Sequence, residues 1–118
     1  MSLTIGEIAK LAATAANEKK AIDTVILNIS ELSLIADYFI ICSGNSETQV
    51  QAIAKEIKES MNKNEVNVRG MVGLSHARWV LLDLGDVVVH VFHRDDRDFY
   101  NLERLWADAP RVKLEELA

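Results

Sequence analysis

Apolar residues recur at three- and four-residue intervals in two stretches of the chain, a spacing typical of helices that bury one face. The first stretch starts at Thr4, which forms a Thr-x-x-Glu capping sequence with Glu7, and continues to about Lys20. The second starts at Ser46, where Ser-x-x-Gln has the same form, and continues to about Met61. The pattern therefore predicts two amphipathic helices.

Short runs of β-branched and aromatic residues, separated by polar or glycine-containing breaks, predict strands in the rest of the chain. The run 37–43 is almost wholly apolar, which predicts a central strand covered on both faces. Residues 84–86 form a compact break between the last two runs and predict a hairpin. The predicted strands are 23–29, 37–43, 66–71, 78–83 and 87–92.

A last helix is predicted after these strands. Acidic residues stand where it begins, as the helix dipole favours, and Pro110 ends it. The acidic residues are Asp95, Asp96 and Asp98, and the apolar positions are Phe99, Leu102, Leu105 and Trp106. Residues 111–118 are expected to form a loose tail.

The order of these elements predicts an α/β fold, with a mixed sheet of about five strands and helices packed against it. The chain of 118 residues fits one domain, predicted over 1–108 and followed by a C-terminal tail over 109–118. Apolar residues make up 49% and charged residues 26%, which is the balance of a folded domain. Because no membrane span or targeting segment is recognisable, we expect no membrane partner and a cytoplasmic, bacterial location.

The charge of the chain bears on its partners. Its net charge is −5, and the densest basic pair is Lys19-Lys20, so direct nucleic-acid binding as the main activity is disfavoured. An acidic domain is better suited to a basic protein partner. The one cysteine, Cys42, lies in an apolar run, cannot form an internal disulfide and is expected to be an inert buried thiol in a reducing compartment.

The sequence gives only weak evidence for an enzyme active site. Gly44-Asn45-Ser46 could cradle a phosphate at a helix start, but a tight turn with a helix cap explains the same residues. Asp83 and Asp86 could bind a metal, but acids are also common beside a turn glycine. His90 and His93 are three apart on a strand and point to opposite faces. We therefore expect no enzyme activity, no cofactor and no metal site.

The hairpin is better explained as a binding surface. Strand alternation places Trp79, Leu81 and Asp83 on one face and Val80 and Leu82 on the other, so both faces are largely apolar. Tryptophan is enriched among the residues that dominate interfaces, although core packing would explain Trp79 and Trp106 equally well. His90 is interpreted first as a polar member of a half-buried strand face and second as a partner contact.

Three stretches of the chain resemble the ribosomal silencing factor, or Iojap, family, in the order and spacing of that family. They are 37–46, the long run 79–92, and 99–106, and the second is the most specific. The resemblance implies a fold related to nucleotidyltransferases but without their catalytic residues. It does not cover the tail from Ala109 onward, so no function is carried onto that segment.

The resemblance also implies a function. Members bind the large ribosomal subunit through large-subunit ribosomal protein 14 and block the joining of the small subunit, which represses translation when nutrients are scarce. The free protein in this family is often a homodimer. Neither chemistry nor a nucleotide is required, because the bound factor occupies the volume that the small subunit needs.

We place the docking patch at the hairpin, with Trp79 and Leu82 as apolar anchors. Strand alternation puts these two on opposite faces, so one of them belongs to the core unless a bulge intervenes. Tyr100 and Trp106 are expected to pack the last helix onto the sheet. The predicted docking residues are Trp79, Leu82, Asp83, Gly85, Asp86 and His90.

Two alternatives stay open at this point. The first is a nucleotidyltransferase-type nucleotide-binding enzyme that uses Ser46 with Asp83 and Asp86. The second is a generic dimeric interaction module.

Overall fold

The strands form one mixed sheet of six, in the spatial order β3-β4-β5-β2-β1-β6, in a computed structural model that describes residues 3–117 apart from the side chain of Phe99. Strands β2 and β5 are parallel, and every other neighbouring pair is antiparallel. The strands are β1 (Ile22–Asn28), β2 (Tyr38–Gly44), β3 (Gly70–Val72), β4 (Trp79–Asp83), β5 (Val87–His93) and β6 (Arg111–Val112).

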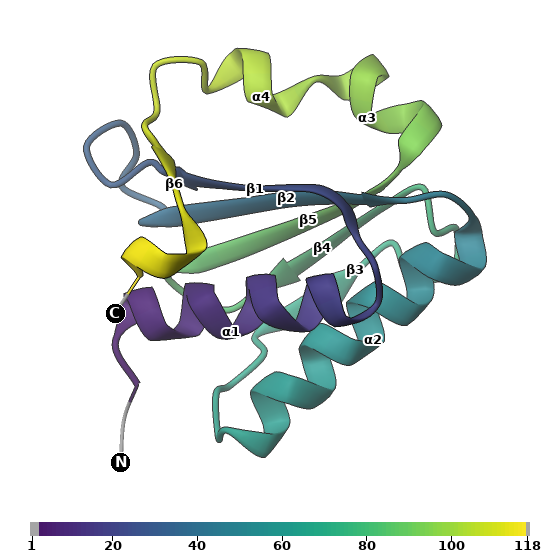
Figure 1. Cartoon of the computed structure of the whole chain (residues 1–118), viewed down its shortest axis with the longest axis horizontal. Coiled ribbons are helices and arrows are strands. Elements are labelled where there is room, and N and C mark those ends of the chain that lie inside the picture. The colour runs from purple at the N-terminus through teal and green to yellow at the C-terminus, as the bar shows by residue number, and fades with distance from the viewer. Residues whose placement is uncertain (1–2, 118) are drawn as a thin grey trace.

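Helices cover both faces of this sheet. The long helices α1 (Ile5–Glu18) and α2 (Glu47–Lys63) lie on one face, called the inner face here, and the short helices α3 (Arg94–Tyr100) and α4 (Leu102–Leu105) lie over the other, the outer face (Figure 1). A 3-10 turn, η1 (Leu114–Glu116), follows β6. The predicted α/β class, with a mixed sheet flanked by helices, is confirmed.

The starts of α1 and α2 follow from their capping residues. Thr4 accepts the N–H of Glu7, and the Glu7 carboxylate accepts the N–H of Thr4, so the predicted capping box is complete. At α2 only half of the box forms: Ser46 accepts the N–H of Gln49. The Gln49 side chain instead accepts the N–H of Asn45 and donates to the carbonyls that follow α1. It thereby ties the end of one long helix to the start of the other.

The inner face carries the larger core. The alanine-rich stripe of α1 and the aliphatic stripe of α2 pack against β2, β4 and β5, and the small alanines let the helix approach closely. The predicted central strand is confirmed, because β2 lies between β1 and β5 and is buried along nearly its whole length. The fully buried members of this core include Ala9, Ala12, Ile40, Cys42, Val50, Ile53, Ile57, Val80, Leu82 and Val89.

The C-terminal part of the chain differs from the sequence prediction in two ways. The last helix is interrupted at Asn101, whose φ of 45° is left-handed and separates α3 from α4. The expectation of a loose tail is wrong, because Arg111 and Val112 pair with β1 as a sixth strand and Leu117 is buried in the inner core. A two-residue strand leaves too little periodicity to recognise in a sequence.

Candidate docking surface

The register of β4 and β5 decides which hairpin residues share a face. Trp79 lies opposite Phe92, Leu81 opposite His90, and Asp83 opposite Val88. Directly opposed residues of an antiparallel pair point to the same side. These six side chains therefore belong to the outer face, and β3 adds Val72 beside Leu81. Val80 and Leu82 point to the inner face and are fully buried.

The outer face is covered unevenly. Helix α3 packs on β5 and β2, and Trp106 after α4 contacts Phe39 of β2 edge-to-face at 5.2 Å between ring centroids. Toward β3 and β4 the face is more open: Val72 is 67% exposed, and Leu81 is half-buried. We call the accessible part of this face the outer patch. It comprises Val72, Trp79, Leu81, Asp83, Val88 and Tyr100.

Trp79 is the most constrained member of the outer patch. Its ring lies 5.0 Å from that of Phe92 and 4.7 Å from that of Tyr100, between centroids. Its indole N–H donates to Nδ1 of His90 at 3.1 Å. The backbone is constrained as well, because Gly73 has a φ of +92° and a Cβ there would lie 2.2 Å from the Trp79 carbonyl oxygen. The half-buried indole is thus held by its neighbours on several sides.

His90 lies beneath Trp79 and is only 4% exposed. Its ring contacts Phe39 edge-to-face at 4.7 Å between centroids. Burial lowers the pKa of His90 from 6.5 to about 4, so the ring is neutral at pH 7. Within residues 3–117, its Nε2 is the buried side-chain polar atom left without a hydrogen-bond partner.

The turn of the hairpin places two acidic residues at one end of the outer patch. Gly85 has a φ of +94°, as the first central residue of a II′ turn requires, and its N–H donates to Oδ1 of Asp83 at 2.9 Å. Asp86 is exposed, and its backbone carbonyl accepts the N–H groups of Asp37 and Tyr38. The turn is thereby joined to the start of β2.

The six predicted docking residues thus lie in four different environments. Trp79 and Asp83 are half-buried on the outer face, Gly85 and Asp86 form the turn, and His90 is buried under Trp79. Leu82 has 0% exposure on the inner face, so the expectation that it is an apolar anchor is wrong. The expectation that Trp79 and Leu82 lie on opposite faces is confirmed.

Two features of this surface were missed in the sequence. Val72 of β3 extends the apolar patch beside Leu81, and the Trp79–His90 hydrogen bond connects two strands. A two-residue turn at Gly85-Asp86 fixes which residues of β4 and β5 lie opposite each other. The sequence therefore carried a signal for which hairpin side chains share a face. Trp106 packs onto the sheet as expected, whereas Tyr100 contacts the ring of Trp79 and still stays 44% exposed.

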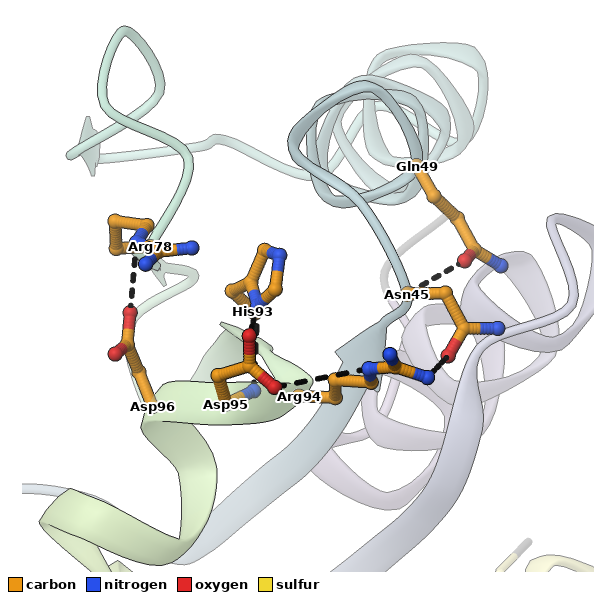
Figure 2. A network of polar contacts seen from close by, with 7 residues as sticks. All are labelled: Asn45, Gln49, Arg78, His93, Arg94, Asp95 and Asp96. Carbon is orange, nitrogen blue, oxygen red and sulfur yellow. Dashed lines mark hydrogen bonds and ion pairs between the residues drawn. The ribbon is translucent and has the colours of Figure 1, made fainter.

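The opposite end of the sheet carries a polar network. Figure 2 shows Arg94 donating to Asn45, whose N–H in turn donates to Gln49. Arg78 pairs with Asp96 at 3.1 Å, and the ring of His93 accepts the N–H of Asp95 at 3.2 Å, as the cap of α3. These contacts fix the starts of α2 and α3 at the carboxyl ends of the two parallel strands.

This arrangement separates the three residues that the nucleotidyltransferase alternative would use together. Ser46 follows the carboxyl end of β2, whereas Asp83 and Asp86 lie level with the amino end of β2. Five strand residues separate the two levels, which is roughly 17 Å. Ser46 and the two acids therefore cannot share one reacting group. In the described part of the chain, no cluster of three or more His, Cys, Asp or Glu side chains could hold a metal ion.

Arg97 of α3 is a buried cation that the sequence did not single out. Its guanidinium donates to Glu103 at 2.9 Å, to Oγ of Ser43 at 2.8 Å, and to the carbonyls of Ile22 and Asp23. All of these partners of Arg97 lie outside helix α3. Arg97 therefore attaches α3 to the ends of β1 and β2 and to α4.

Cys42 matches its expectation as a buried thiol. It has 0% exposure, and burial raises its pKa to about 12, against a smaller opposing effect of the Arg97 charge. In residues 3–117, no helix is both long and apolar enough to cross a membrane.

Comparison with known proteins gives a consistent result. A family model described as "Ribosomal silencing factor during starvation" matches residues 2–118. The "Ribosomal silencing factor RsfS" of Bacillus subtilis is 56% identical over 108 residues, which cover 92% of each chain.

Two solved structures share the fold. A crystal structure from Bacillus halodurans is 51% identical, with a TM-score of 0.82, and covers 91% of this chain and 97% of its own. A crystal structure of a Chromobacterium violaceum protein is 37% identical, with a TM-score of 0.88, and covers 89% and 88% respectively.

Proposed function

Because the chain belongs to the family of ribosomal silencing factors, we propose that it binds the large ribosomal subunit through large-subunit ribosomal protein 14 and prevents the small subunit from joining. The observation that carries this proposal is the outer patch. It is an apolar, aromatic surface on a rigid sheet, and half-buried Trp79 lies within it.

The composition of the outer patch resembles the centre of a protein interface more than that of an active site. Interface centres are enriched in tryptophan and tyrosine, and here the rings of Trp79 and Tyr100 are in contact. Val72 and Tyr100 remain 67% and 44% exposed, so a partner would remove further apolar surface from water. The sheet beneath holds these side chains in place before binding, which lowers the entropy cost of association.

Charge supports a basic partner. The net charge is −5, and Asp83 and exposed Asp86 lie at the turn beside the outer patch. A ribosomal protein offers lysine and arginine side chains that complement such acids and speed encounter. Because Asp83 already accepts one N–H from Gly85, its second oxygen is the better placed to meet a partner's donor.

The mechanism that follows is steric. A factor on the face of the large subunit that meets the small subunit excludes that subunit, and the two binding events compete by mass action. Neither catalysis nor a cofactor is required. The result in the bacterial cytoplasm is reduced translation when nutrients are scarce.

The direct test is subunit joining. Purified small and large subunits are mixed with increasing amounts of the protein and separated on sucrose gradients. We expect the joined fraction to fall as the protein becomes bound to the large subunit. An unchanged joined fraction at saturating protein would contradict the steric mechanism.

Trp79→Ala tests the location of the site. Removal of an anchoring tryptophan costs about 2–4 kcal/mol of binding, which is roughly 30- to 1000-fold in Kd. The matched control is Leu34→Ala, which truncates an apolar side chain that is fully exposed in the loop between β1 and β2, outside the outer patch. We expect the control to change the Kd for large subunits less than about threefold. Equal effects of the two substitutions would place the site elsewhere.

The identity of the partner is tested with isolated large-subunit ribosomal protein 14. It should bind the chain and compete with large subunits for it. Subunit binding without such competition would preserve the steric mechanism but assign the contact to another ribosomal component.

We further propose that the free protein is a homodimer, as an exposed apolar sheet face favours. Sedimentation equilibrium between micromolar and millimolar concentrations measures this. A single monomeric species over that range would contradict the proposal without affecting ribosome binding.

A further inference from the structure

The hydrogen bond between Trp79 and His90 defines which nitrogen of the histidine ring carries the proton. An indole N–H can only donate, so Nδ1 of His90, 3.1 Å away, is the acceptor and carries no proton. A neutral imidazole with a bare Nδ1 holds its proton on Nε2. The contact therefore requires one particular tautomer of His90.

That tautomer leaves a polar group buried without a partner. Nε2 of His90 makes no hydrogen bond in the described part of the chain, and the ring is surrounded by Phe39, Leu81 and Ile41. An unpartnered buried donor lowers stability, and an apolar side chain of similar size would avoid that cost. Packing of the sheet therefore gives no reason for a histidine at this position, whereas its Nδ1 has a specific contact.

The hydrogen bond controls a degree of freedom that the ring contacts leave open. The torsion that turns an indole about its Cβ–Cγ bond has two broad, roughly opposite minima. The tilted contacts with Phe92 and Tyr100 confine the plane of the Trp79 ring but do not select which edge points into the sheet. The hydrogen bond selects it, because only one orientation brings Nε1 to His90.

We propose that His90 is the positioning residue of the docking surface: by accepting the indole N–H of Trp79 it fixes the one ring orientation that Trp79 presents to the ribosomal partner. This inference rests on the proposed function for its binding consequence, but the fixed ring orientation is a property of the free protein. His90 itself is buried and does not touch the partner.

The first measurement uses the free protein. Trp79 and Trp106 give separate indole N–H signals in a ¹⁵N-labelled sample, and Trp106 is the internal reference. In His90→Leu we expect the Trp79 indole proton to exchange with water at least about tenfold faster, while the Trp106 proton keeps its rate. In His90→Asn, whose Oδ1 takes the place of Nδ1, we expect protection to be retained. An unchanged Trp79 indole proton in His90→Leu would overturn the inference.

The second measurement separates positioning from stability. We expect His90→Leu to weaken binding to large subunits about tenfold while the midpoint of urea unfolding stays equal or rises, because the substitution removes the unpartnered Nε2 donor. His90→Asn should bind within about threefold of the unsubstituted chain. A loss of binding that follows a loss of stability in both variants would show a merely structural role and overturn the inference.

A double-mutant cycle makes the test independent of how well His90→Asn folds. Trp79→Phe keeps an aromatic ring but removes the N–H donor. If His90 acts through that donor, His90→Leu should change binding by less than about twofold in the Trp79→Phe background. A full tenfold effect there would overturn the inference.

Failure of the proposed function is distinguishable from failure of this inference. If the unsubstituted chain does not bind large subunits, the proposed function fails, and the indole exchange rates still decide whether His90 fixes the ring. If the chain binds and His90→Leu binds equally well despite a freed indole, only the positioning role fails.

Discussion

The two faces of the sheet differ in composition and in how their helices are attached. The inner face is aliphatic and closed: α1 and α2 cover it with alanine, valine and isoleucine side chains at close to 0% exposure. The outer face is aromatic and partly open, with Trp79 and Tyr100 at its accessible side. Shape-matched aliphatic packing supplies stability, whereas rigid and incompletely buried aromatic rings leave surface for a partner. The two faces of the sheet therefore differ in burial: the inner face is closed, whereas the outer face leaves aromatic surface accessible.

The attachment of the helices follows the same division. Helices α1 and α2 are held by apolar stripes along more than three turns each. Helix α3 has seven residues, and its buried cation Arg97 reaches three neighbouring segments. The attachment of the outer helices therefore includes directional polar contacts that one substitution can remove, beside the apolar contacts of Leu102 and Trp106.

The largest expected effect comes from neighbouring leucines on opposite faces. Leu82→Ala leaves a cavity in the closed core and should lower the free energy of unfolding by about 2–5 kcal/mol. Leu81→Ala, on half-buried Leu81, should lower it by only about 1 kcal/mol. Urea unfolding measures both free energies. Among folded samples, binding to large subunits should show the reverse order: Leu81→Ala should bind more weakly than Leu82→Ala. Equal stability losses in the two variants would contradict the claim that the inner face contributes more to stability than the outer face.

Acid should weaken the outer face through His90. Its folded pKa of about 4 lies below its ordinary value of 6.5, so between these pH values the unfolded chain binds a proton that the folded chain excludes. The free energy of unfolding therefore falls as the pH falls from 6.5 toward 4, by about 3 kcal/mol in full. Unfolding of the unsubstituted chain and of His90→Leu at pH 7, 5.5 and 4.5 isolates this contribution. Parallel pH dependences would show that the His90 site is open to solvent.

Arg97→Met should detach the outer helices. The substitution leaves Ser43 and two backbone carbonyls without their donor, at a cost of about 2 kcal/mol. Glu103 also loses Arg97, but it can still pair with Arg111 at 3.8 Å. Amide exchange should accelerate in α3 before α1. Arg94→Met is the control, because Arg94 is exposed and its loss should change stability by less than about 0.5 kcal/mol. Uniform acceleration in both helices would argue against a separate attachment.

The smallest effect concerns Cys42 on the inner face. With a pKa of about 12 and no exposure, it should react with thiol reagents only when the chain unfolds. The labelling rate should therefore equal the opening rate derived from urea unfolding and increase in Leu82→Ala. Fast labelling of the folded chain would show that the inner face opens locally.

The sequence predicted the main elements because each long element carries its own signal. The Thr4 capping box, the Ser46 cap, the two helical periods and the central apolar strand are local features, and all are found, although the second half of the Ser46 box does not form. The missed sixth strand and the break at Asn101 have no such periodicity, since each spans one or two residues. Alternation also placed Trp79 and Leu82 on opposite faces before the structure showed which face was closed.

The sequence by itself thus determined the two long helices, the central strand and the family, because these depend on the order of residues along the chain. Only the tertiary structure decided that Leu82 belongs to the core and that His90 supports Trp79. It also decided that Ser46 lies far from Asp83 and that Arg97 fixes the outer helices. These facts depend on which helices cover which face and on the register between strands. Contacts between distant segments fix both, and no local pattern encodes them.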